Sequence, residues 1–107
     1  MFVVVACSPS AAPEAITGLT AGLSGGSEEI AVSWDASVAS DLDHYNVYFS
    51  LDPGESKELL TDVPGTDTAY IDHPRDLVEG FNCYEVTAVD SDGNESEPSD
   101  EACFTAT

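Results

Sequence analysis

Alternation between hydrophobic and polar residues, with a period of two, dominates the chain from Glu14 onward, and no long helical periodicity interrupts it. In one run, for example, the alternation places Tyr45, Val47 and Phe49 on the same face of a strand. The predicted strands are residues 14–23, 29–35, 43–50, 56–61, 66–71, 81–89 and 99–106. Turn residues such as Asp92-Gly93-Asn94 separate them. Seven short strands at this spacing predict an all-β, seven-stranded antiparallel sandwich of two sheets over residues 14–107.

Four segments carry a family resemblance through their order and spacing. They are Ile-Ala-Val-Ser-Trp at 30–34, Ser-Asp-Leu-Asp-His-Tyr-Asn-Val-Tyr at 40–48, Tyr-Glu-Val-Thr-Ala-Val-Asp at 84–90 and Gly-Asn-Glu-Ser-Glu-Pro-Ser at 93–99. Together they resemble a fibronectin type III domain, most closely the versions on bacterial and archaeal secreted proteins. The resemblance implies an immunoglobulin-like sandwich with Trp34 as its core tryptophan. It also implies inward-facing side chains at Tyr45, Val47, Val86 and Ala88.

The cysteines predict a disulfide between two strands. Gly93 lies midway between Cys83 and Cys103, so an antiparallel hairpin centred there would place the two cysteines opposite one another. Such a disulfide implies an oxidising compartment outside the cytoplasm. By alternation we expect it on the exposed face of its sheet. The same register places Glu85 opposite Glu101, an unfavourable pair that high ionic strength or a bound cation would relieve.

The charge balance excludes some classes of partner. Of the 107 residues, Lys57 and Arg75 are basic and 21 are acidic, which gives a net charge of −19. Such a field repels phosphate, so neither nucleic acid nor an anionic membrane surface is an expected partner. Life in high salt and an ordinary acidic secreted domain both fit this charge.

The N-terminal segment 1–7 is apolar and uncharged, and residues 8–13 form a linker-like stretch. Val4-Val5-Ala6-Cys7 resembles the lipobox of bacterial lipoproteins, which implies acylation of Cys7 and a membrane link through that lipid alone. Alternatively, Phe2, Val3, Val4 and Val5 form a strand that pairs with another copy of the chain, and Cys7 pairs between chains or is buried. The partners would then be other copies or neighbouring surface proteins.

Two loops offer further chemistry. Carboxylates at Asp41, Asp43, Asp90 and Asp92 are weak candidates for a calcium site, because acidic residues lie at both ends of the predicted sandwich. We therefore expect them to be solvated surface groups, with no cofactor required. Asn94-Glu95-Ser96 is a glycosylation sequon at a loop tip.

The sequence offers little for catalysis. Neither His44 nor His73 has a serine or cysteine nucleophile at a recognisable spacing, and there is no glycine-rich phosphate loop. We expect a non-enzymatic extracellular or cell-surface module with a structural or adhesive role. It would be tethered through Cys7 or assembled through residues 1–7 into a filament or particle. The alternative is a binding module for a carbohydrate, calcium or a basic protein, which would use the acidic loops or the face around Tyr48.

Overall fold

The computed structural model describes residues 12–23, 29–72 and 80–106. The predictions for residues 1–7, for the linker up to residue 11 and for His73 lie outside these residues. Seven strands are present: β1 (Thr20–Leu23), β2 (Ile30–Ser33), β3 (Leu42–Ser50), β4 (Glu58–Pro64), β5 (Ala69–Asp72), β6 (Gly80–Asp90) and β7 (Ala102–Ala106). In the part of the chain described here, no helix could traverse a lipid bilayer.

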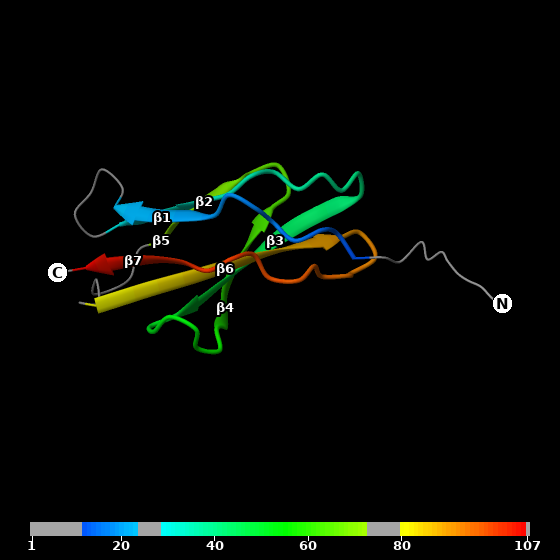
Figure 1. The fold of residues 1–107 in the computed structure, drawn as a ribbon. Helices are drawn as coiled ribbons and strands as arrows, with labels where there is room; N and C mark the ends of the chain where they lie inside the picture. Colours follow the sequence, from blue (N-terminus) through cyan, green and yellow to red (C-terminus); the bar gives the residue numbers. More distant parts are fainter. Residues whose placement is uncertain (1–11, 24–28, 73–79, 107) are drawn as a thin grey trace.

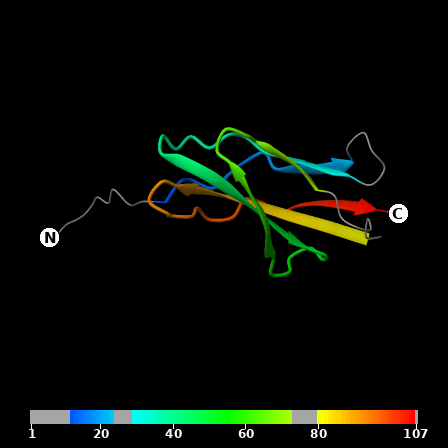
Figure 2. The same ribbon diagram turned by 180° about the vertical axis from the view of Figure 1, so that it is seen from behind.

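The strands form two antiparallel sheets that pack face to face (Figure 1). One sheet has the order β1-β2-β5 and the other the order β4-β3-β6-β7. Figure 2 shows the same two layers from behind, with the long β3 and β6 crossing beneath the three-stranded sheet. The predicted all-β sandwich of seven strands in two sheets is confirmed.

The predicted strand ends differ from the observed ones where the backbone leaves the ladder. The first strand begins only at Thr20, six residues later than the alternation predicts. Gly18 has a φ of 75°, which favours glycine, and a Cβ there would collide with the Asp35 carboxylate. The fourth strand runs from Glu58 to Pro64 instead of 56–61, with a bulge opposite Val47 and Tyr48.

Inward-facing residues of both sheets form the core. Tyr45, Val47, Val86 and Ala88 are completely buried, as the resemblance implied. Trp34 packs edge-on against Tyr45, with ring centroids 5.2 Å apart. Each buried side chain of this size contributes about 1.5–3 kcal/mol through its transfer from water.

A hydrogen bond joins the two sheets inside the sandwich. The Tyr84 hydroxyl of β6 donates to Asp72 Oδ2 of β5 at 2.6 Å, and both residues are buried. Burial, followed by the neighbouring Asp72 carboxylate, raises the pKa of Tyr84 far above its usual value. The tyrosine therefore stays protonated and remains the donor.

Segment 95–99 runs beside β6 without forming a regular ladder. Ser96 donates its N–H to Ala88 O, and its hydroxyl accepts the Ala88 N–H. Ser99 makes the same pair of bonds with Val86. Pro98 lies between the two serines and has no N–H to donate. The serine hydroxyls thus take the place of backbone carbonyls, and the last strand begins at Ala102 rather than at residue 99.

Candidate functional site

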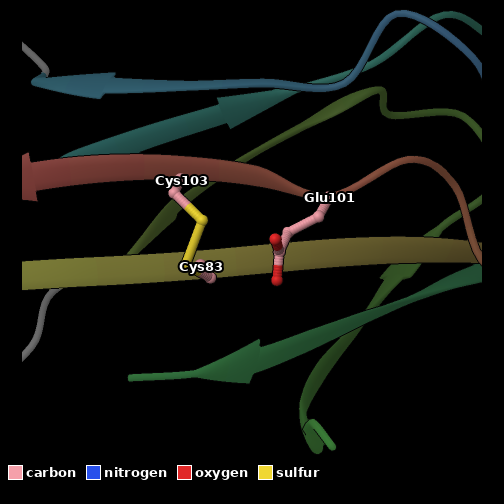
Figure 3. A group of neighbouring side chains, drawn as sticks. All are labelled: Cys83, Glu101 and Cys103. Atoms are coloured by element: carbon pink, nitrogen blue, oxygen red, sulfur yellow. A yellow bond between two sulfur atoms is a disulfide. The ribbon is translucent and has the colours of Figure 1, made fainter. Parts of the chain in front are cut away.

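The disulfide between Cys83 and Cys103 is present on the outer side of the four-stranded sheet (Figure 3). The two cysteines are cross-strand partners in the β6–β7 ladder, in the register expected around Gly93. The disulfide lies on the face of the sheet that alternation predicts, but on this face Cys83 is completely buried and Cys103 is half-buried. Bonding to Cys103 and the sheet around it cover the Cys83 sulfur, although alternation directs it away from the core.

A buried lysine lies beside this disulfide. Lys57 Nζ is 2.5 Å from Glu101 Oε2 and 4.0 Å from Glu85 Oε2, and its side chain is 3% exposed. The Gly54 N–H donates to the same Glu101 oxygen at 2.8 Å. The hydrogen bond from Lys57, followed by that from Gly54, lowers the pKa of Glu101 below its usual value.

The positive charge of Lys57 offsets the expected repulsion between the carboxylates of Glu85 and Glu101. These two residues adjoin Tyr84 and Ala102, the last pair of the β6–β7 ladder. Lys57 Nζ lies near both carboxylates, so the chain itself supplies a cation that offsets their repulsion. As a result, the β3–β4 connection is fastened to the start of β7.

A second polar cluster surrounds Glu95 on the same face. Glu95 Oε2 accepts hydrogen bonds from the Tyr48 hydroxyl, from Thr87 Oγ1 at 2.5 Å and from Asn46 Nδ2 at 3.2 Å. Burial raises the pKa of Glu95, but these hydrogen bonds outweigh it, so the pKa is lowered overall. Burial and the Glu95 carboxylate raise the pKa of Tyr48. Glu95 thus joins side chains of β3 and β6 to the segment after β6, and it fixes the position of the Tyr48 hydroxyl.

A hollow of about 280 Å³ opens between these two clusters. Its lining includes Tyr48, Thr87 and Glu95 from one cluster and Lys57 and Glu85 from the other. Among the aromatic residues, only Tyr48 was expected from the sequence to offer an outward face, and it lies in this hollow. Lys57 and Glu95 were not singled out from the sequence.

The candidate calcium ligands come together only in part. Carboxylate oxygens of Asp41, Asp90 and Asp92 lie within 4.8 Å of one another, whereas Asp43 pairs with His44 Nδ1 at 2.7 Å instead. Asp90 Oδ1 accepts the N–H groups of Asp92 and Asn94, and Asp90 Oδ2 accepts Asn94 Nδ2. The hydrogen bond from the Asn94 N–H is the main cause that lowers the pKa of Asp90, against an opposing effect of burial. Asp90 thus shapes the loop through both of its oxygens.

The glycosylation candidate takes part in this loop. Asn94 is half-buried, and its amide nitrogen, the atom a glycan would join, lies 3.2 Å from Asp90 Oδ2. A glycan at this position would have to coexist with that hydrogen bond or replace it.

Comparisons with known proteins bear on the fold. No protein-family model and no curated protein sequence matches the chain. The structure is similar to a Fn3-like protein from Clostridium thermocellum, with 28% identity and a TM-score of 0.74 over 91% of this chain and 96% of that one. It is also similar to chicken CNTN1 FN1–FN3 domains, with 18% identity and a TM-score of 0.71 over 89% of this chain and 31% of that one. The chain has a fibronectin type III fold.

A further similarity is to part of a larger protein. The Clostridium perfringens spore cortex lytic enzyme SleM is 28% identical, with a TM-score of 0.70, over 87% of this chain and 28% of that one. The fibronectin type III fold therefore occurs both in a protein of this size and as one part of longer chains. The likeness supports a binding or structural module and gives no positive sign of catalysis.

Proposed function

We propose that the chain is a non-catalytic structural or adhesive module of the extracellular space or the cell surface, held in place by its N-terminal segment. The observation that carries this proposal is the path of the chain through the sandwich. The described chain starts at one end, beside the turn after β6, and β7 runs to the opposite end (Figures 1 and 2). A domain with this path can act as a spacer, because attachments at its two chain ends are held a domain length apart.

The disulfide supports a place outside the cytoplasm, because cross-strand disulfides persist in oxidising compartments. Both polar clusters on the outer face support a structural role, since each holds two or more chain segments together. The space between the two sheets is filled by the chain's own core side chains.

Residues 1–7 supply the attachment in either of two forms. Acylation of Cys7 would tether the domain to a membrane, whereas a donated strand would link it to another copy. The intact mass of the protein from its native source, measured without reduction, tests the proposal. A chain that begins at Cys7 and carries acyl mass supports the tether, and a lipid-free chain that retains residues 1–7 supports assembly. A mature chain that lacks residues 1–7 and any acyl group would contradict both forms.

The second candidate function is carbohydrate binding at the hollow beside Tyr48. A tyrosine flanked by fixed carboxylate, hydroxyl and ammonium groups offers an apolar ring together with hydrogen-bonding groups. The similarity to SleM, a spore cortex lytic enzyme, is compatible with such a role. Affinity electrophoresis in gels that contain soluble polysaccharides tests it. Retardation that is lost in Tyr48→Ala and kept in Phe81→Ala would support this function, and unretarded migration in every gel would count against it.

A further inference from the structure

An exposed apolar patch lies along β4 and the β3–β4 connection. Leu51, Leu59 and Leu60 are 50%, 58% and 38% exposed. With Phe49 they line a hollow of about 390 Å³, and its rim also carries the carboxylates of Asp52, Glu55 and Glu58. We call the three leucines and Phe49 the β4 patch. Several leucines exposed together on an acidic domain indicate a contact surface, because exposure of a contiguous apolar patch to water is unfavourable.

The backbone next to the β4 patch is able to accept a strand. β4 is the outermost strand of its sheet, and on its far side it pairs with no strand of the described chain. Pro64 ends the edge, which leaves Glu58–Val63, six residues, for pairing with an added strand. An added strand of this length would extend over about 20 Å.

The net charge of −19 restricts which strand can bind there. Two copies that meet through acidic strands would repel one another, and β4 itself carries Glu58 and Asp62. The first acidic residue of the chain is Glu14, so the stretch 1–13 has no charged side chain. Within it, Phe2–Cys7 is apolar, rich in β-branched valine and six residues long, which matches the available edge in both length and chemistry.

We propose that Phe2–Cys7 of one copy adds as a strand to β4 of a second copy and covers the β4 patch. This inference rests on the assembly form of the proposed function. Backbone hydrogen bonds along β4 give the added strand its register, and its apolar side chains bury Leu51, Leu59 and Leu60. The contact joins two different surfaces, so each copy can both donate and accept, and the copies form an open chain unless the geometry closes a ring.

Cys7 provides a direct test, because Cys83 and Cys103 are already bonded to each other. The full-length chain is prepared with the substitution Leu59→Cys and treated with diamide, and non-reducing electrophoresis is then used to separate the products. We expect a ladder of disulfide-linked dimers and higher multimers, which is lost when Cys7→Ser is added. The matched control is Val38→Cys, since Val38 is 81% exposed but lies outside β4. Equal ladders in both cysteine variants, or a link within single chains, would overturn the proposal.

Sedimentation velocity of the unmodified chain gives an independent readout. We expect concentration-dependent oligomers that are lost in Leu60→Asp and in Val4→Asp and retained in Val38→Asp, with all three variants folded by circular dichroism. A monomer at all concentrations up to about 100 µM would overturn the inference. An acylated native Cys7 would overturn it too, while leaving the tethered form of the proposed function intact. A native chain without residues 1–7 and without lipid would instead remove the proposed function itself.

Discussion

Replacement of Lys57 by methionine tests whether the Lys57–Glu101 pair stabilises the fold. The substitution keeps most of the side chain's length and removes its charge. It leaves Glu85 and Glu101 next to one another without the cation that lies 4.0 Å and 2.5 Å from them in the native structure. We expect Lys57→Met to be clearly destabilising.

The size of the effect follows from the burial of the pair. A hydrogen bond between charged groups contributes about 1.5–3 kcal/mol. The Glu101 side chain is 24% exposed, so water replaces part of the lost interaction and the lower half of that range applies. We expect a loss of about 2 kcal/mol in the free energy of unfolding, which for a domain near this size lowers Tm by about 8 °C.

The pH dependence of the stability tests the same ion pair. The folded-state pKa of Glu101 is lowered, so its contribution to stability is complete above the pKa of the unfolded chain. The contribution is lost as the pH falls through the folded-state value. The difference in stability between the native chain and Lys57→Met should therefore be large at pH 7 and should shrink in the acidic range below the usual glutamate pKa.

Urea denaturation at pH 7 in moderate salt is the assay, because urea does not screen charges. Lys57→Arg is the control that keeps the positive charge. In Lys57→Met/Glu101→Gln the unpaired carboxylate is removed, so this double variant should regain part of the stability lost in Lys57→Met. The reasoning would be refuted if Lys57→Met were as stable as the native chain, or if the double-mutant cycle gave a coupling energy near zero.

Three further predictions concern other parts of the sandwich. Cys83→Ala/Cys103→Ala removes a crosslink between residues 20 apart and should lower the free energy of unfolding by about 3 kcal/mol, measured by urea denaturation without reductant; unchanged midpoints would contradict this. Tyr84→Phe leaves the buried Asp72 without its 2.6 Å donor and should cost about 1–3 kcal/mol by thermal unfolding, whereas Tyr70→Phe in β5, which keeps this hydrogen bond, should cost less. Millimolar calcium should raise Tm no more than an equal ionic strength of sodium chloride, because both Asp90 oxygens already accept hydrogen bonds; a calcium-specific rise of several degrees would show a real site.

The strands and the disulfide could be predicted because local rules determine them. Period-two alternation identified the inward faces of β3 and β6, and the position of Gly93 midway between the cysteines indicated the correct partners. The structure gives Gly93 a φ of 88°, as expected for a turn glycine. The pairing nearest the turn, Val89 with Glu95, is centred on Asp92, so the register at the cysteines also depends on the irregular segment 95–99.

The outer-face clusters could not be predicted, since each depends on segments far apart in the sequence. Lys57 meets Glu101 across 44 residues, and Tyr48 meets Glu95 across 47. In the sequence, Lys57 appears as one basic residue in a turn-rich connection, and Glu95 as one of many carboxylates. The bulge at Leu60 in β4 also depends on how β3 pairs with its neighbour, because Val47 pairs with Thr61 and Tyr48 with Leu59.

The acidic surface and the polar contacts on it together determine where another molecule can bind this domain. The carboxylates of the two polar clusters are engaged within the domain, with Glu95 bound by three side chains and Glu101 by Lys57 and Gly54. These contacts stabilise the fold, whereas the remaining exposed carboxylates repel other copies. An attractive contact with another copy therefore requires exposed apolar side chains on one copy and an uncharged segment on the other. Within the described chain, the β4 patch combines exposed leucines with an unpaired strand edge, and the uncharged Phe2–Cys7 is the complementary segment in the sequence.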